Sequence, residues 1–320
     1  MKSILNSAKK EATPPKKLQQ KKQRVVKIAC NLVGECIEKY PQVVGFELGG
    51  SYAKGTWVPE KPVDNVDIDI FVKFNKKTSE KDFRNIGTEI GFESLKKYKP
   101  YTRHAEHPFV EAIIDGTRVN VVPCYDVNKG EWKSATDRSI YHTKFMLQKL
   151  SNSMKGDVRI LKKFLQHIEV YGAEIAKEGF SGYVTEALIF YFGSFEKTIK
   201  KISELKKGQV IGKSTKKFDS FVVIIDPIDN NRNLGTAISI ENLGKFVLAS
   251  RAFLRNPSKN FFKKPISKRI MRNTDKIIVV QFKVKERSDD IVWGQIKRAS
   301  NALKTQLELG GFTVLRNSSV

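Results

Sequence analysis

The sequence has few cysteines, no long apolar run and a shortage of acidic residues. Its three cysteines, Cys30, Cys36 and Cys124, match no zinc-ligand spacing and no disulfide framework, so we expect buried thiols in a reducing compartment. No apolar run approaches the roughly eighteen residues that a membrane span needs. The N-terminus also lacks the apolar region of a signal peptide. These absences predict a cytoplasmic protein that inserts into no membrane.

The shortage of acidic residues leaves a strongly basic chain. Its 320 residues include 58 Lys and Arg against 34 Asp and Glu, a formal net charge of +24. A balance that basic favours a polyanionic partner, nucleic acid before an anionic membrane surface. A hydrophobic content of 40%, with 20 Phe, indicates a folded protein, and the length predicts two or three domains.

One stretch pairs a glycine-rich turn with two alternating acids. An apolar run at 43–48 breaks at a Gly-Gly-Ser turn that contains Gly50 and Ser51. Asp67 and Asp69 then alternate with apolar residues, which predicts a strand with both carboxylates on one face, their Cα atoms about 6.5–7 Å apart. Two such acids repel each other unless a cation lies between them, and Mg²⁺ prefers oxygen ligands.

Each half of this pattern is common by itself. A Gly-Gly-Ser sequence is an ordinary turn, and Asp-x-Asp is usually a solvated strand edge. Together, in this order and on successive strands, they resemble the signature of the nucleotidyltransferase superfamily related to DNA polymerase β. Glycine lets the backbone approach a ligand closely, and the hydroxyl of Ser51 with neighbouring amides can hold a phosphate. The combination predicts a site for phosphate and metal.

Periodicity predicts a mixture of helices and strands along the rest of the chain. We expect helices over 23–40, 80–97, 157–170, 181–201, 241–254 and 291–309. We expect strands over 110–114, 118–122, 221–225, 276–284 and 312–316. The first two strands are joined by Asp115 and Gly116, a strong signal for a hairpin.

Further sequence blocks follow the glycine-rich turn in a fixed order. They are GGSYAKGTW at 49–57, DID at 67–69, AEHP at 105–108, VVPCY at 121–125, YGAE at 171–174, GFSGY at 179–183, and DP at 226–227 followed by RN at 232–233. This series resembles the archaeal-type (class I) CCA-adding tRNA nucleotidyltransferases. The resemblance extends from about the first helix to the C-terminal end.

The resemblance implies an α+β protein with a polymerase β-like nucleotidyltransferase head, a helical neck and a small α+β body. We expect a basic, partly disordered N-terminal arm over 1–24 and the head over 25–140. We expect a nucleotide-binding neck over 141–256 and a tRNA-facing body over 257–320. Family members continue into a further tail, which we expect to be absent here.

The resemblance also implies an activity and its residues. Family members add C, C and A to the 3′ end of tRNA from CTP and ATP without a nucleic-acid template, and they release pyrophosphate by two-metal transfer with Mg²⁺. Carried over by position, the catalytic and metal-binding residues are Asp67, Asp69 and Asn120. The nucleotide-binding residues are Gly50, Ser51, Lys54, His142, Lys162, Tyr171 and Arg232, and Arg232 helps to select the base.

Two of these positions depart from the family pattern. Asn120 stands where the best-known members have a third catalytic aspartate, and an amide adds no negative charge and accepts no proton. Lys54 stands where some members have Arg, so the bidentate fork is lost. Two alternatives stay open: a poly(A)- or oligoadenylate-type nucleotidyltransferase, and a catalytically silent tRNA-binding paralogue. The oligomeric state is open as well, with a homodimer as one option.

Overall fold

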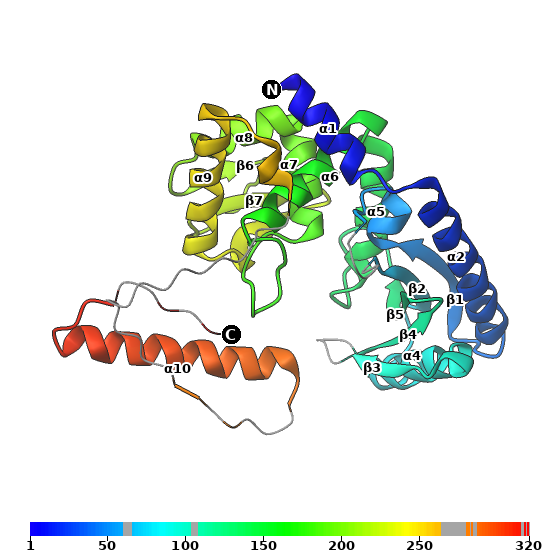
Figure 1. Cartoon of the computed structure of the whole chain (residues 1–320). Helices are drawn as coiled ribbons and strands as arrows, with labels where there is room; N and C mark the ends of the chain where they lie inside the picture. The colour runs from blue at the N-terminus through cyan, green and yellow to red at the C-terminus, as the bar shows by residue number, and fades with distance from the viewer. Residues whose placement is uncertain are drawn as a thin grey trace.

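The structure, a computed structural model, describes residues 1–59, 66–103, 108–263, 280–281, 283, 287–314, 317 and 319. It contains two β-sheets, and each lies among its own set of helices (Figure 1). The block at 105–108 and the predicted strand over 276–284 fall mostly outside the described residues. Within the described part of the chain, no helix combines the length and the apolar character that a membrane crossing requires.

The first sheet has five strands in the order β1-β2-β5-β4-β3, and only the β2–β5 pair is parallel. The strands are β1 (Val43–Gly49), β2 (Ile68–Asn75), β3 (Tyr101–Arg103), β4 (Phe109–Ile114) and β5 (Thr117–Asp126). Helices α2 (Lys16–Ile37) and α4 (Glu80–Ser94) pack against each other and cover one face of this sheet (Figure 1). A short helix α3 (Gly50–Lys54) follows β1, and a 3₁₀ turn η1 (Lys96–Tyr98) follows α4.

Alternation along β2 and β5 separates the core from the site. Ile68, Ile70 and Val72 of β2 point to the helix-covered face and are almost fully buried there with Val119 and Val121 of β5. The intervening residues of both strands therefore point to the opposite face. That opposite face is the one that α3 and α5 (Asp137–Lys149) approach.

The second body is mainly helical and has one aromatic core. Its helices are α6 (Asn152–His167), α7 (Gly182–Phe192), α8 (Phe195–Ser203), α9 (Ile240–Arg255) and the 3₁₀ turns η2 (Leu234–Ala237) and η3 (Lys259–Phe262). Its small sheet has the order β6 (Gln209–Ile211), β7 (Val222–Asp226), β8 (Asp229–Asn233). Phe164 of α6 is fully buried and stacks on Phe261 at 5.6 Å between ring centroids. It also contacts Phe195, Phe246 and Phe253 edge-on or tilted, so aromatic packing joins α6, α8 and α9.

The N-terminal residues differ from the expected partly disordered arm, because they form two helices. Helix α1 (Lys2–Ala12) buries Leu5, Ala8 and Ala12 against the helical body, and Lys9 forms a 2.9 Å ion pair with Asp157 of α6. These apolar residues are spaced by three and four positions, so they lie on one face of the helix. The high lysine content of the segment had favoured a disordered arm instead. Helix α2 then begins at Lys16, well before the predicted position 23.

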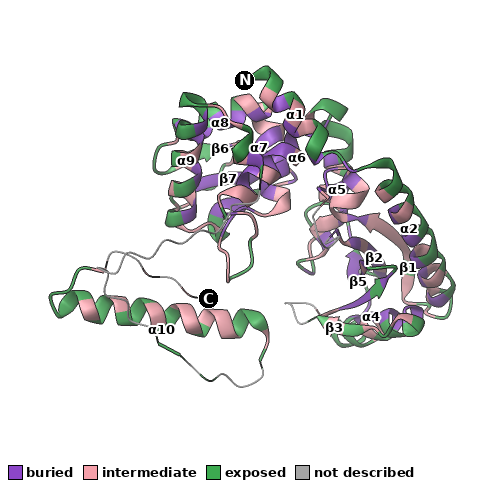
Figure 2. Ribbon diagram, viewed as in Figure 1, coloured by how far each residue is buried: buried purple, intermediate pink, exposed green. Residues whose placement is uncertain are grey.

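Most other predicted elements are present with shifted ends. The hairpin turn is confirmed, since Asp115 and Gly116 both have positive φ angles, 48° and 68°. The helix predicted over 181–201 is two helices, because Gly193 adopts a left-handed conformation with φ 85° and ends α7. Helix α10 (Asp289–Leu309) confirms the predicted C-terminal helix and has no buried residue (Figure 2). A strand was predicted over 312–316. Residues 312–314 do not form a strand, and residues 315 and 316 lie outside the described residues.

Candidate active site

The predicted acids and Asn120 lie together on the face of the first sheet opposite α2 and α4. In the parallel pairing of β2 with β5, Asp69 lies directly opposite Asn120, whose Nδ2 donates a 2.9 Å hydrogen bond to Asp69 Oδ1. In the antiparallel pairing of β4 with β5, Glu111 lies directly opposite Asn120 on its other side. Asp69, Asn120 and Glu111 thus form one row across three neighbouring strands, which we call the acid row. Asp67 lies two residues before Asp69 and on the same face.

The electrostatics of these acids favour a cation. Burial raises the pKa of Asp67 to about 6, opposed by the positive charge of Arg118 and reinforced by the negative charge of Asp69. The Nε atom of Arg118 lies 2.7 Å from Asp67 Oδ1. Burial also raises the pKa of Asp69, against the hydrogen bond from Asn120 and the charge of Lys54. Two carboxylates with raised pKa values in one place are stabilised as anions by a nearby positive charge.

The oxygen atoms of this site suit a divalent cation. The Oδ1 atom of Asn120 is buried and has no hydrogen-bond partner, so an oxygen donor is left over beside the two aspartates. Carboxylate and amide oxygens are the donors that hard cations prefer. Within the described ranges, no three His, Cys, Asp or Glu side chains lie close enough together to hold a metal ion, so Asp67, Asp69 and Glu111 do not form such a group in their present conformations.

The glycine-rich turn lies directly against Asp69. Gly49, the last residue of β1, pairs with Asp69, and Gly50 opens α3 with φ 69°. A Cβ atom on Gly50 would lie 1.9 Å from Asp69 Oδ2, so only glycine fits between the turn and the acid. Ser51 follows in the first turn of α3. The structure therefore brings the predicted phosphate-binding turn and the predicted metal ligands together.

Lys54 and Lys162, both predicted to bind nucleotide, share one buried carboxylate that we did not predict. Glu186 of α7 is fully buried, and its Oε2 lies 2.5 Å from Lys54 Nζ. Its Oε1 accepts a hydrogen bond from Thr56 and lies 3.9 Å from Lys162 Nζ. Burial would raise the pKa of Glu186, but the two lysines bring it below the usual range. This set, the Glu186 cluster, joins the first sheet's body to the helical body.

Tyr171 and Lys162 meet at the start of α7. A Cβ atom on Gly182, the first residue of α7, would lie 3.1 Å from the Tyr171 hydroxyl and 3.5 Å from Lys162 Nζ. Tyr171 is held there by a bridge to Phe180 in the segment just before the helix. A hydroxyl and an ammonium group over a helix N-terminus form a suitable environment for an anion.

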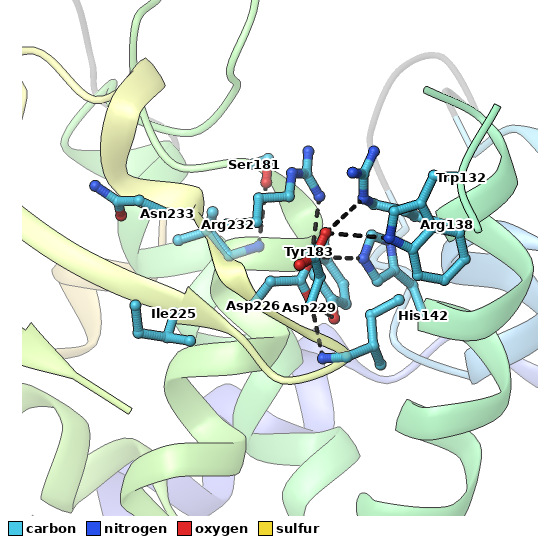
Figure 3. Close-up of polar contacts among 12 residues, drawn as sticks. Trp132, Arg138, His142, Ser181, Tyr183, Ile225, Asp226, Asp229, Arg232 and Asn233 are labelled. Atoms are coloured by element: carbon cyan, nitrogen blue, oxygen red, sulfur yellow. Dashed lines mark hydrogen bonds and ion pairs between the residues drawn. The ribbon is translucent and has the colours of Figure 1, made fainter. Parts of the chain in front are cut away.

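His142 and Arg232 also converge, on Asp226 (Figure 3). Asp226 Oδ2 lies 2.9 Å from His142 Nε2 and 3.0 Å from Arg232 Nη1, while its Oδ1 accepts a 2.9 Å hydrogen bond from Tyr183. The His142 ring stacks on Tyr183 with centroids 3.6 Å apart. Asp229 binds separately to Trp132 and Arg138. We call His142, Tyr183, Asp226 and Arg232 the Asp226 cluster.

Charge states within the Asp226 cluster are set by burial and hydrogen bonding. Burial lowers the pKa of His142 below its usual value, and the hydrogen bond to Asp226 only partly offsets this. Burial would raise the pKa of Asp226, but the hydrogen bonds it accepts from His142, the Ile228 amide and Tyr183 bring it below the usual range. The lowered pKa favours an ionised Asp226, which orients His142 and Arg232 through its hydrogen bonds.

Lys54 connects the three groups of residues. Its charge acts on Asp69 of the acid row and on His142 of the Asp226 cluster, and its Nζ lies 5.6 Å from the centre of the Tyr183 ring. Every predicted site residue therefore lies in or beside one connected polar region. Sequence reasoning missed Glu111, Glu186, Asp226 and Tyr183 as site residues, although two of them lie within the quoted sequence blocks.

The fold defines the class of protein. Residues 29–142 match the family model "Nucleotidyltransferase domain", and residues 156–263 match "tRNA nucleotidyltransferase, second domain". The solved structure of a cytoplasmic RNA terminal U-transferase superposes on this chain with a TM-score of 0.60 at 14% sequence identity. The superposition covers 83% of this chain and 100% of that one. A Cid1 poly(U) polymerase bound to Mg 3′-dATP gives 0.60 at 13% identity, covering 82% and 98%. The α+β fold is therefore that of polymerase β-like nucleotidyltransferases.

Curated relatives define the family within this class. The CCA-adding enzyme of Pyrobaculum islandicum is 36% identical over 326 aligned positions, covering 99% of this chain and 75% of that protein. The CCA-adding enzyme of Sulfurisphaera tokodaii is 37% identical over 275 positions, covering 84% and 65%. The chain belongs to the family of CCA-adding enzymes, the tRNA nucleotidyltransferases of archaea.

Proposed function

We propose that this protein adds C, C and A to the 3′ end of tRNA from CTP and ATP, without a nucleic-acid template, and releases pyrophosphate. The 36% sequence identity to a CCA-adding enzyme, over an alignment that covers 99% of the chain, supports these substrates. One structural observation carries the chemistry: the glycine-rich turn at Gly50 lies in contact with Asp69, so a bound triphosphate and the metal-binding acids share one place.

In the proposed reaction, the 3′ hydroxyl of tRNA attacks the α-phosphorus of the nucleotide and pyrophosphate leaves. Asp67 and Asp69 are the residues that hold the divalent cations, which we propose to be Mg²⁺, with Asn120 beside them. Bound there, Mg²⁺ supplies positive charge for the attacking and leaving oxygens. Arg118 neutralises Asp67 in the described state, so it must move aside or lend its charge when the site is filled.

The nucleotide-binding residues have separate proposed roles. Gly50 and Ser51 bring backbone amides to the triphosphate. Lys162 and Tyr171, which meet at the start of α7, bind the phosphates and ribose, and His142 assists them. Arg232 selects the base from a position that Asp226 holds. Lys54 links the two bodies through Glu186 and contributes its charge to Asp69.

We extend the proposal to the organisation of the whole chain. The proposed head covers 25–140 and the proposed neck covers 141–256. In the proposed body over 257–320, η3 (Lys259–Phe262) packs on the neck, and we propose that the rest faces tRNA. The 24 excess positive charges supply phosphate contacts that do not depend on sequence. We place the protein in the cytoplasm, because Cys30, Cys36 and Cys124 are all free thiols.

The first test is an incorporation assay with tRNA that lacks its terminal CCA, Mg²⁺, labelled CTP and ATP. We expect addition of three nucleotides. The double variant Asp67→Ala/Asp69→Ala should abolish it, whereas the control Glu204→Ala/Asp219→Ala, which removes two exposed acids, should not.

Asn120 supports one rival function, a catalytically silent tRNA-binding paralogue, because it removes a charge from the metal site. That rival predicts tRNA binding with no incorporation by the folded protein. Incorporation of A alone would instead indicate a poly(A)- or oligoadenylate-type enzyme. Addition of three nucleotides that persists in the Asp67→Ala/Asp69→Ala variant would refute the proposed site.

A further inference from the structure

Glu111 is a buried acid that the proposed reaction does not yet use. The β4–β5 pairing places it directly opposite Asn120, and only 5% of it is exposed. Its Oε1 accepts a hydrogen bond from the hydroxyl of Tyr101 on β3. Among the described residues Glu111 forms no ion pair, and the Arg118 charge that acts on the same residues is paired with Asp67. Burying a carboxylate without an ion-pair partner is costly, which makes Glu111 a candidate for a functional role.

Glu111 is electrostatically part of the acid row. The side chains of Asp69, Asn120 and Glu111 share one face, because residues directly opposite each other on paired strands do so. The negative charge of Glu111 raises the pKa of both Asp67 and Asp69. Between Glu111 and these aspartates lies Asn120, whose buried Oδ1 has no partner.

We propose that Glu111 supplies the negative charge that Asn120 lacks, as the third carboxylate of the cation site. Glu111 lies on β4, and Asp69 lies two strands away on β2. Neighbouring strands are about 4.8 Å apart, whereas a glutamate side chain is only about 1.5 Å longer than an aspartate side chain, so Glu111 is too short to be a direct ligand of a cation beside Asp69. In the structure Glu111 accepts a hydrogen bond from Tyr101, so to act on the cation it would have to turn toward Asn120 and would add its charge from beside the amide oxygen rather than as a direct ligand. This inference rests on the metal site of the proposed function and assigns that site a residue from β4.

The alternative role of Glu111 is structural, as the hydrogen-bond partner of Tyr101. The two roles differ in what they require of Glu111. A structural role requires an acceptor for the Tyr101 hydroxyl, which a glutamine provides as well as a glutamate. The proposed role requires a negative charge, which a glutamine lacks. Glu111→Gln therefore separates charge from hydrogen bonding.

The decisive measurement is Mn²⁺ affinity of the full chain without tRNA or nucleotide, from titrations that follow the electron paramagnetic resonance of free Mn²⁺. We expect Glu111→Gln to weaken Mn²⁺ binding at least about tenfold, because one of three negative charges is lost. In an Asn120→Asp background the same substitution should weaken binding less than about threefold, since position 120 then supplies the charge. Equal effects in the two backgrounds, or no effect in either, would overturn the inference.

Two further variants keep the test decisive if Glu111→Gln does not fold. Tyr101→Phe removes the hydrogen bond but keeps the carboxylate, so we expect Mn²⁺ affinity that is unchanged or tighter; a loss as large as tenfold would refute the proposed role. Asn120→Asp alone should tighten Mn²⁺ binding less than about threefold, because Glu111 already provides the third charge. A gain of tenfold or more would show that the site has only two charges and would refute the inference.

The incorporation assay on the same variants distinguishes this inference from the proposed function. If the unmodified protein adds CCA and Mn²⁺ affinity ignores Glu111→Gln, the inference fails and the function stands. If the protein adds nothing and Mn²⁺ affinity still falls with Glu111→Gln but recovers with Asn120→Asp, the function fails and the inference stands.

Discussion

Asp69 Oδ2 lies 1.9 Å from the point where a Cβ atom on Gly50 would be. The turn after β1 and the acid of β2 are therefore in direct van der Waals contact across the antiparallel β1–β2 pair. This contact has a functional meaning under the proposed reaction, because it sets the distance between the triphosphate and the cations that Asp69 holds. A reacting geometry of this kind tolerates little displacement.

Gly50→Ala should therefore damage both activity and stability. The new methyl group would push Asp69 away, and φ 69° is unfavourable for alanine. We expect incorporation to fall at least about a hundredfold and the free energy of unfolding to fall by about 1–3 kcal/mol. Incorporation kinetics and urea denaturation measure the two effects. Gly130→Ala is the matched control, since Gly130 has φ 97° but nothing within 4 Å of its Cβ position; an equal loss of activity there would contradict this account.

Cation binding should depend on pH through Asp67. With a pKa of about 6, Asp67 must lose a proton before it binds a cation, so Mn²⁺ affinity should fall as the pH drops below about 6, by up to about tenfold per unit.

Without metal, the folded state binds this proton more tightly than the unfolded state, so Asp67's contribution to stability declines as the pH rises from about 4 to about 6. Mn²⁺ titrations and thermal unfolding across that range measure both effects. Asp67→Asn should remove Asp67's share of both slopes; unchanged slopes would refute the assignment.

Glu186→Gln should be strongly destabilising. The substitution leaves Lys54 and Lys162 buried with no negative charge between them, and breaking a buried ion pair costs about 3–5 kcal/mol. Chemical denaturation at neutral pH measures the loss. Glu241→Gln is the control, because Glu241 forms an exposed pair with Lys245 on α9 and should cost no more than about 0.5 kcal/mol. Similar losses for the two variants would mean that the Glu186 cluster contributes little to holding the bodies together.

Asp226→Asn should impair nucleotide binding more than folding. It removes the charge that orients His142 and Arg232, and a hydrogen bond to a charged group is worth about 1.5–3 kcal/mol. We expect KM for CTP and for ATP to rise about tenfold or more. The pKa of His142 should also fall further, because Asp226 now raises it, and NMR titration of the imidazole can follow this. Asp219→Asn, an exposed control, should change neither quantity; a His142 pKa that does not move would argue against the contact.

The position of Glu111 opposite Asn120 was accessible from the sequence. The two-residue turn at Asp115 and Gly116 sets the hairpin register, and counting outward from it pairs 114 with 117 and then 111 with 120. The alternation of Asp67 and Asp69 with apolar residues was likewise enough to place both acids on one face, because every second side chain of a strand points to the same face of the sheet.

Local pattern by itself thus determined the glycine turn, the paired acids, the hairpin and most of the helices, since these depend on residues close together in the chain. Only the tertiary structure decided which distant groups meet. Glu186 joins Lys54 across 132 positions, and Asp226 joins His142 across 84. No periodicity encodes such contacts, because they form only where the two bodies bury polar groups against each other and a buried charge is stabilised by an opposite one.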